Sequence, residues 1–375
     1  MGRPNVRTGN GRLAMGVAAV AVLAVAGGAA FAAHRGPVAS PSAAARPLAA
    51  TATPVRSTVK VDLGKLPTGR PPQVAYVSGR TIRGGLGEDV TVPGRQEIIR
   101  AVRYDGDALV ILEVGMGGSE LVRVSKDQGI LPGSTPAVAS LVTSVNEDAV
   151  AYGTARTNAD HTSRQGNAVY WRNAFTDNKL DRPEDWASTV LAVVGDTVYF
   201  AASTDRDGQT STLNVWHTQT GQVDLLKSFR SPAVVDFQGT NGVDQISGAA
   251  QTFCSAIREL ATGSQLWRTC EYSLNGFTPD GRTVIATPDF RGEGGDPSTT
   301  AIDSRSGAVR RQWTGVHFLG ATAEDDDHLL MVVDTGENTA GAIIRCSIGS
   351  GACELATAPT RTPRRDTLRL MGERF

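Results

Sequence analysis

The sequence lacks an excess of charge of either sign. Its 375 residues carry 37 Lys and Arg against 38 Asp and Glu, which gives a formal net charge of −1 at pH 7. A near-neutral chain has no general affinity for nucleic acid or acidic lipid. Neither a basic helix nor a basic stripe interleaved with aromatic residues is present, so we expect no nucleic-acid partner.

Recognisable sets of catalytic or metal-binding residues are also missing. The sequence contains no G-x-S-x-G motif and no C-x-x-C pair. The segment Asp205-Arg206-Asp207-Gly208 is a fragment of a calcium loop, and we interpret it as a hairpin turn. None of the five His is spaced for a metal site or a catalytic triad: His34, His161, His217, His317 and His328. We therefore expect no catalytic residue, no metal and no cofactor.

Three different segments follow one another at the N-terminus. Residues 1–12 contain three Arg and no acidic residue, and residues 13–33 are uncharged and apolar. As a helix, the second segment would cross the ~30 Å core of a bilayer, with the basic head in the cytoplasm and the rest of the chain outside. Residues 34–56, rich in Ala, Pro, Ser and Thr, predict a disordered stalk. The length of residues 13–33 favours an uncleaved signal anchor in the cytoplasmic membrane. The alternative is a signal peptide cleaved at Ala30-Phe31-Ala32, which would release a secreted protein.

Short β-rich runs separated by turns fill residues 57–375. One strand–turn–strand unit recurs at intervals of 42, 49, 43, 42, 44 and 44 residues, centred on Gly87, Gly129, Asn178, Gly221, Gly263, Gly307 and Gly351. A second series of polar turns precedes apolar runs, at residues 105–107, 146–148, 195–196, 241–242, 280–281 and 325–327. This period, with about four strands per unit, is typical of a β-propeller. We predict an all-β fold of seven four-stranded blades, with six or eight as alternatives, closed by residues 58–63 or 367–371.

The four cysteines lie in two of these hairpins. Cys254 and Cys270 flank the turn at Gly263, and Cys346 and Cys353 flank Gly349-Ser350. Residues equidistant from an antiparallel turn face each other, close enough for a disulfide. We predict two hairpin disulfides rather than a zinc site, which agrees with a location outside the cytoplasm.

Several turn motifs resemble those of known propeller families. GFTPDGRTVIATP (residues 276–288) resembles the repeat of TolB-like and WD40-like propellers, and AIRELATGSQLW (256–267) resembles quinoprotein-type repeats. With its N-terminal segments, the chain resembles the membrane-anchored TolB-like and PD40 propellers of actinobacteria. This resemblance implies the fold and leaves the ligand open.

The sequence departs from these families in three ways. The stalk cannot be the N-terminal domain of TolB, and no adjacent Cys pair of quinoproteins is present. The hydrolase domain of prolyl-oligopeptidase relatives has no room in this chain.

The best candidates for a binding site are four long, charged loops between second and third strands, at residues 154–167, 203–212, 289–299 and 334–341. Long polar loops on a rigid scaffold often bind ligands, although they can also be tolerated insertions. The candidate residues are Arg156, His161, Arg164, Arg206, Arg291, Glu293, Asp296 and, in a preceding connection, Trp186. We predict a non-catalytic binding or scaffold propeller, tethered to the membrane, that contacts a protein or cell-envelope ligand through these loops. The alternative is a glycan-active or quinone-dependent enzyme with carboxylates or a stacking Trp at the central channel.

Overall fold

The computed structural model describes residues 57–115, 117–158, 160, 162–247, 253–288, 295–336, 339–361 and 368–371. Every described residue belongs to one compact unit, Thr53–Phe375. The predicted head, membrane span and stalk lie outside the described residues. Within the described part of the chain, no helix is long and apolar enough to cross a membrane.

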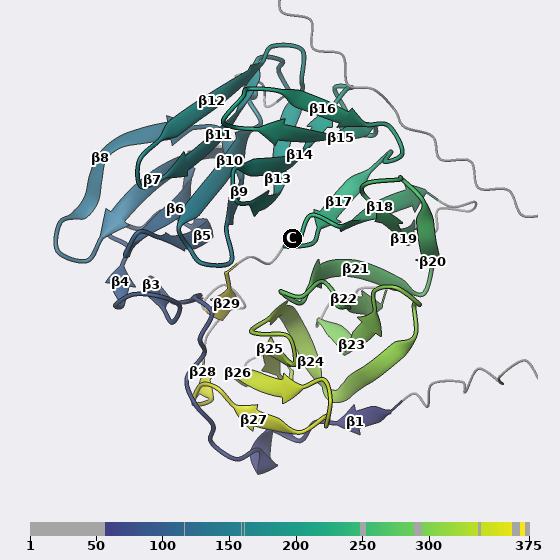
Figure 1. The fold of residues 1–375 in the computed structure, drawn as a ribbon. Coiled ribbons are helices and arrows are strands. Elements are labelled where there is room, and N and C mark those ends of the chain that lie inside the picture. Colours follow the sequence, from purple (N-terminus) through teal and green to yellow (C-terminus); the bar gives the residue numbers. More distant parts are fainter. Residues whose placement is uncertain are drawn as a thin grey trace, which may run out of the picture. The chain divides into compact units, whose positions relative to one another are not determined.

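The described residues form seven antiparallel four-stranded units, which follow one another around a common centre (Figure 1). Unit 1 contains β29 (Leu368–Leu370), β2 (Tyr76–Ser78), β3 (Thr81–Arg83) and β4 (Val90–Thr91). Unit 2 contains β5 (Ile98–Tyr104), β6 (Asp107–Val114), β7 (Gly118–Ser125) and β8 (Gly129–Pro136). Unit 3 contains β9 (Val138–Thr143), β10 (Ala149–Thr154), β11 (Asn167–Asn173) and β12 (Asp177–Arg182). Unit 4 contains β13 (Ala187–Val194), β14 (Thr197–Ser203), β15 (Ser211–His217) and β16 (Val223–Leu226).

The remaining units follow the same pattern. Unit 5 contains β17 (Pro232–Val235), β18 (Asn241–Ser247), β19 (Phe253–Glu259) and β20 (Gln265–Thr269). Unit 6 contains β21 (Tyr272–Phe277), β22 (Thr283–Pro288), β23 (Asp296–Asp303) and the first part of β24 (Val309–Ala323). Unit 7 contains the second part of β24, β25 (His328–Asp334), β26 (Ala340–Ser347) and β27 (Cys353–Leu355). The shared strand β24 merges units 6 and 7 into one sheet, to which β1 (Thr58–Lys60) and β28 (Thr360–Arg361) also belong.

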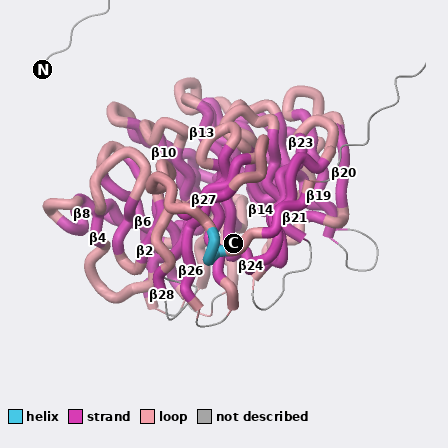
Figure 2. Tube along the Cα trace, turned by 90° about the horizontal axis from the view of Figure 1, so that it is seen from below, coloured by secondary structure: helices cyan, strands magenta, loops and turns pink. Residues whose placement is uncertain are grey.

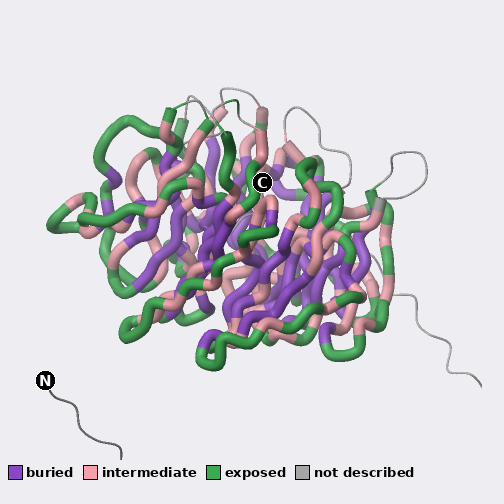
Figure 3. The backbone as a smooth tube through the Cα atoms, turned by 90° about the horizontal axis from the view of Figure 1, so that it is seen from above, coloured by how far each residue is buried: buried purple, intermediate pink, exposed green. Residues whose placement is uncertain are grey.

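The second strands of the units are buried on both faces. All six residues of β10 are buried, and so are residues 108–112 of β6. Side chains alternate between the two faces of a strand, so a continuous apolar run requires packing on both sides. The outermost strand β12 instead alternates between exposed and half-buried residues. Figure 3 shows the same gradient, with buried strands inside and exposed loops at the margins.

Hydrophobic clusters lie between successive units. Within the described residues, seven such clusters each join one unit to the next. One of them packs Tyr76 and Leu370 of unit 1 against Leu330, Val332 and Ile343 of unit 7. The first and last units are therefore joined through an apolar interface like the others. Strands, turns and loops make up the described structure apart from the short 3-10 helix η1 (Leu63–Lys65) (Figure 2). This arrangement fits the β-propeller that the repeat predicts.

The two turn series lie largely where the sequence predicts them. In four of the hairpins between third and fourth strands, a glycine N–H donates to the carbonyl four residues earlier: Gly221, Gly263, Gly307 and Gly351. Gly263 has a φ of +71°, a conformation that glycine adopts without steric cost. Two weaker placements shift by a few residues, because β12 already begins at Asp177 and β18 at Asn241. In the second case the buried Asp236 forms the turn by accepting from the N–H groups of Thr240 and Asn241, at 2.8 and 2.9 Å.

Closure of the ring uses the second of the two predicted segments. Strand β29 pairs with β2, with Tyr76 opposite Leu370, and so completes unit 1 with residues from the far end of the chain. Strand β1 instead runs parallel to β24, with Val59 opposite Trp313. It therefore extends unit 6 and takes no part in joining unit 7 to unit 1.

Both predicted disulfides are confirmed. Cys254 is bonded to Cys270 and Cys346 to Cys353, with Cα–Cα distances of 4.1 Å in each pair. Cys346 lies directly opposite Cys353 in the β26–β27 register. Cross-strand pairing in an antiparallel hairpin therefore selects the partners. Each disulfide joins the third strand of a unit to the residues of its outer edge.

Candidate functional site

The structure brings together two of the residues predicted to bind a ligand at the long loops. Trp186 and Arg206 line an open pocket of about 500 Å³ with Thr162, Ser163 and Asp207. The loops of units 3 and 4 form its walls. Trp186 is half-buried, and its N–H donates to the Ser203 carbonyl at 3.0 Å, which fixes its backbone beside the unit 4 loop. Across the pocket, the hydroxyl of Thr162 lowers the pKa of Asp160, with a smaller contribution from the charge of Arg206.

The other predicted residues are distributed differently. Arg156 and Arg164 are exposed on the unit 3 loop, where the Arg164 N–H donates to the Arg156 carbonyl at 2.9 Å. Asp296 lies in unit 6, away from this pocket and on the wall of the cavity described below. His161, Arg291 and Glu293 lie outside the described residues. Of the five predicted residues that the structure describes, two line this pocket, two lie on the unit 3 loop and one lies at the axial cavity.

The calcium-loop fragment is a hairpin loop. The carboxylate of Asp205 accepts from the N–H groups of Gln209 at 2.9 Å and Thr210 at 2.6 Å. These bonds close the loop between β14 and β15 and use both carboxylate oxygens. Among the described residues, no group of three or more His, Cys, Asp or Glu is placed to hold a metal ion.

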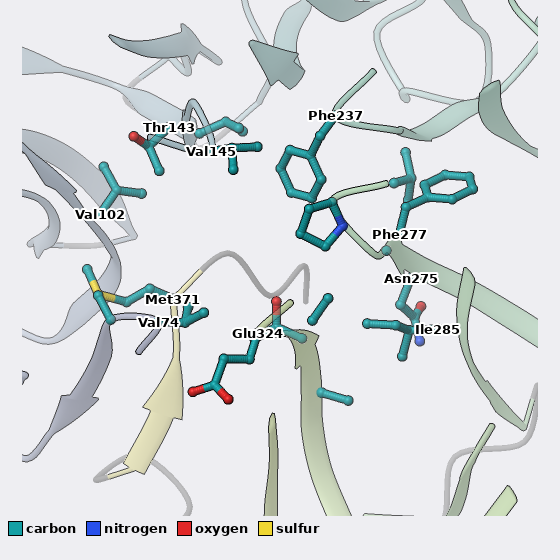
Figure 4. Close-up of a pocket in the computed structure, with 18 of the residues that line it drawn as sticks. Val74, Val102, Thr143, Val145, Phe237, Asn275, Phe277, Ile285, Glu324 and Met371 are labelled. Atoms are coloured by element: carbon teal, nitrogen blue, oxygen red, sulfur yellow. The ribbon is translucent and has the colours of Figure 1, made fainter. Parts of the chain in front are cut away.

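A second space, more enclosed than the first, lies at the centre of the ring. A cavity of about 430 Å³, here called the axial cavity, is lined by residues from all seven units. The inner strands supply most of its wall, with Val102 and Thr143 on one side and Phe277 and Ile285 on the other (Figure 4). Phe237, in the turn between β17 and β18, also lines it. The wall is largely apolar, which suits burial of apolar ligand groups.

Carboxylates also reach the axial cavity, but none of the Trp side chains in the described residues lines it. The carboxylates are Glu147, Asp296 and Glu324. Of the two features expected for the enzyme alternative at the central channel, the structure therefore has the carboxylates and not the stacking Trp.

One of these carboxylates, Glu324, has a structural role. Its side chain is fully buried and pairs with Arg345, which is also buried. The Arg345 Nη2 donates to Glu324 Oε1 at 2.7 Å, and the Gln73 N–H donates to the same oxygen at 2.7 Å. Arg345 also donates to the carbonyls of Arg70 and Pro71, at 2.9 and 3.0 Å. The pair therefore binds unit 7 to the segment that leads into unit 1.

Glu147 is held at the cavity under strain. It follows β9 in a turn and has a φ of +58°, a conformation that costs a non-glycine residue about 1–2 kcal/mol. The Leu86 N–H donates to its Oε2 at 3.0 Å. Burial raises the pKa of the Glu147 carboxyl, opposed by this hydrogen bond and by the charge of Arg103. Strain and a raised pKa together mark Glu147 as a functional candidate.

Glu147→Gln should stabilise the protein at pH 7 and leave its stability unchanged near pH 4. The folded state holds the Glu147 proton more tightly than the unfolded state, whose pKa is near 4.5. Protonated Glu147 therefore contributes to the free energy of unfolding. This contribution is complete below the unfolded pKa and is lost as the pH rises through the folded pKa. After allowance for solvent exposure, the gain at pH 7 is less than about 1 kcal/mol. Urea unfolding at both pH values measures it, with the exposed Glu113→Gln as control. A stabilisation that is equal at both pH values would contradict the pKa argument.

Sequence reasoning missed the axial cavity because its residues have no common motif. Glu147 falls in a turn that the sequence does identify, but nothing in the letters Asn-Glu-Asp indicates a positive φ at the central residue. Glu324 directly precedes the predicted turn at residues 325–327, and Phe237 lies four residues before the predicted turn at 241–242. Only closure of the ring places these turns around one space.

Comparison with known proteins identifies relatives of the fold. No family model and no curated protein sequence matches the chain. Among solved structures, it resembles a prolyl endopeptidase analysed for inter-domain dynamics in catalysis and specificity, at 13% identity, TM-score 0.50, covering 79% of this chain and 48% of that one. It also resembles prolyl oligopeptidase B from Galerina marginata bound to a 35-residue hydrolysis and macrocyclization substrate, at 11% identity, TM-score 0.52, covering 79% and 52%. The chain thus spans about half the length of these proteins, and at such identities the likeness is one of fold.

These neighbours correct two predictions, that the chain is not an enzyme and that it is a non-catalytic scaffold. The solved structures that it resembles are those of peptidases. The matched part covers about half of each peptidase, so it need not contain the reacting groups. The missing catalytic set in a propeller sequence, on which both predictions rested, therefore does not argue against an enzyme.

Proposed function

We propose that this propeller is the substrate-binding part of an enzyme that acts on peptides, and that the axial cavity receives the peptide. The observation that carries this proposal is the cavity itself, an apolar space of about 430 Å³ enclosed by all seven units. Pockets for small ligands and short peptide segments have volumes of about 300–1,000 Å³ and mostly apolar walls with a few polar groups. The fold relatives support the choice of peptides, since the oligopeptidase structures contain peptide substrates of 25 and 35 residues.

The chemistry of the wall suits a peptide better than a glycan or a quinone. Phe237, Phe277 and Val145 offer apolar surface for side chains, while Asn275 and Thr143 offer hydrogen-bonding groups for the peptide backbone. Figure 4 shows the two phenylalanines across the cavity from Val102 and Met371. A peptide, which carries apolar side chains on a backbone of amides, can contact both the apolar and the hydrogen-bonding residues of this wall.

We also place this function outside the cytoplasm, at the membrane. The two disulfides support this location, since such bonds persist in oxidising compartments. The basic and apolar segments of residues 1–33 support a membrane tether, or secretion if that segment is cleaved. The peptide would then come from a protein of the cell envelope. Kinship with TolB-like and PD40 propellers is part of the same proposal, supported by the motif at residues 276–288, which spans the β21–β22 hairpin.

The test is binding of neutral peptides to the full chain purified in detergent. The probes are dye-labelled octapeptides with capped ends, containing proline and apolar residues. Val145 lines the cavity and is 52% exposed, so Val145→Arg should fold and weaken binding at least tenfold. Leu225 lies on β16, is 47% exposed and does not line the cavity, so Leu225→Arg should bind as the wild type does.

Cleavage is measured in the same samples by mass spectrometry, with the chain alone and after addition of envelope extract. Peptide products should form and should decrease in the Val145→Arg variant. Absence of peptide binding by the wild type, or equal binding by Val145→Arg, would show that the cavity is not the binding site. Binding without cleavage under either condition would refute the enzymatic part of the proposal.

A further inference from the structure

A buried arginine at the wall of the axial cavity lacks part of its hydrogen bonding. Arg103, near the end of β5, is only 1% exposed. Its Nε donates to the Gly84 carbonyl at 3.3 Å and its Nη2 to the Ile82 carbonyl at 3.1 Å. Its Nη1 is buried and has no hydrogen-bond partner in the structure. Buried guanidinium donors are normally all paired, so Nη1 can donate to a hydrogen-bond acceptor on a bound ligand.

The charge of Arg103 is also not balanced by a contact. Within the described residues, no carboxylate oxygen is recorded within 4.0 Å of its guanidinium, although the charges of Glu147 and Asp89 act on it from further away. Burial lowers the pKa of Arg103, against the effect of those two carboxylates. An unpaired buried cation is costly, and the cost falls when an anion binds it.

The surroundings select the kind of anion. The axial cavity already contains the Glu147 carboxylate, whose charge acts on Arg103 and would repel a dianion such as a phosphate more strongly than a singly charged group. A carboxylate has one negative charge and accepts hydrogen bonds from arginine with good geometry. Leu86, Val102 and Met371 lie on the same cavity wall and offer apolar contact to a group next to that carboxylate.

The geometry points to Arg103 as the residue that binds the C-terminal carboxylate of a peptide, with the terminal apolar side chain against Leu86, Val102 and Met371. This inference rests on the proposed function and specifies which end of the peptide the cavity recognises. Glu147, held by the Leu86 N–H at 3.0 Å, lies beside this position and restricts it to ligands with a single negative charge.

The test compares two forms of one peptide on the full chain in detergent. The probe is a peptide of sequence Ala-Ala-Pro-Leu with a dye at its N-terminus, either with a free C-terminal carboxylate or as the amide. We expect the free acid to bind the wild-type chain at least tenfold more tightly than the amide. Arg103→Met should remove this preference, and Arg103→Lys should retain part of it. Arg123 lies in the same unit, pairs with Asp105 and Asp107, and does not line the cavity, so Arg123→Met should retain the full preference.

The comparison on the wild-type chain does not depend on how well any variant folds. Equal binding of acid and amide would overturn the role of Arg103 and leave peptide binding in the cavity intact. Binding of neither form would overturn both the carboxylate site and the proposed function. Retention of the preference in a folded Arg103→Met variant, checked by near-ultraviolet circular dichroism, would show that another cation binds the carboxylate.

Discussion

Arg345→Met should lower the free energy of unfolding by about 3 kcal/mol, because it leaves the buried Glu324 carboxylate with the 42% exposed Arg70 as its remaining cationic partner. The side chains of Arg345 and Glu324 are 3% and 0% exposed. Arg345 also donates to the carbonyls of Arg70 and Pro71, so its loss removes two further hydrogen bonds between unit 7 and the segment leading into unit 1. Urea unfolding of the full chain in detergent measures the change. The dependence of the unfolding free energy on urea concentration should be the same in the wild type and the variant, which shows that both unfold in the same way.

Two further variants distinguish the cost of leaving a carboxylate buried from the cost of losing an exposed ion pair. The double variant Arg345→Met with Glu324→Leu should be more stable than Arg345→Met alone, because it removes a buried carboxylate that has lost its buried cationic partner. Lys65→Met removes an ion pair with Asp62 whose side chains are 82% and 54% exposed. That change should cost less than about 1 kcal/mol. If Arg345→Met were no more destabilising than Lys65→Met, the pair would not hold the ring closed.

Removing the disulfide between Cys254 and Cys270 should destabilise the protein by about 3 kcal/mol, and removing that between Cys346 and Cys353 by about 2 kcal/mol. The difference follows from sequence separations of 16 and 7 residues, since a longer closed loop restricts the unfolded chain more. Paired Cys→Ala variants avoid placing a hydroxyl at these sites, of which Cys254 and Cys346 are buried. Urea midpoints of the two variants give the measurement.

Reductant provides the control for the disulfide experiment. Treatment of the wild type with dithiothreitol should reproduce the combined loss, and the variant lacking all four cysteines should not respond. A wild-type midpoint that does not change on full reduction would show that the disulfides do not stabilise the fold. A larger loss for the Cys346–Cys353 variant would show that strain or packing, rather than loop length, determines the effect.

The fold was largely predictable because the same strand–turn–strand pattern recurs in each unit. Each unit needs a tight turn between its outer strands, and glycines such as Gly263 and Gly307, with φ values of +71° and +73°, meet that need visibly in the sequence. Buried second strands need continuous apolar runs, as in β10. Where a side chain forms the turn instead, as Asp236 does before β18, the predicted turn lies a few residues from the observed one.

The site was much less predictable. Trp186 and Arg206 do share a pocket, because loops of neighbouring units meet. Asp296 belongs to the axial cavity instead, since its position at the start of β23 places it in the wall of unit 6. The sequence predicts a polar turn at residues 325–327. The structure buries the Glu324 side chain beside that turn against Arg345, which lies 21 positions further along the chain.

The sequence by itself determined the repeat, the strand–turn pattern and the pairing of the cysteines, because each depends on residues close together in one hairpin. Only the tertiary structure decided which segment closes the ring and what lies at its centre. Those features require contacts between residues about 270 positions apart, such as Arg345 with Pro71. They also depend on the direction in which each inner strand presents its side chains once all seven units meet. The burial of Arg103 also depends on tertiary packing, since its guanidinium lies against Ile82 and Gly84 of the neighbouring unit.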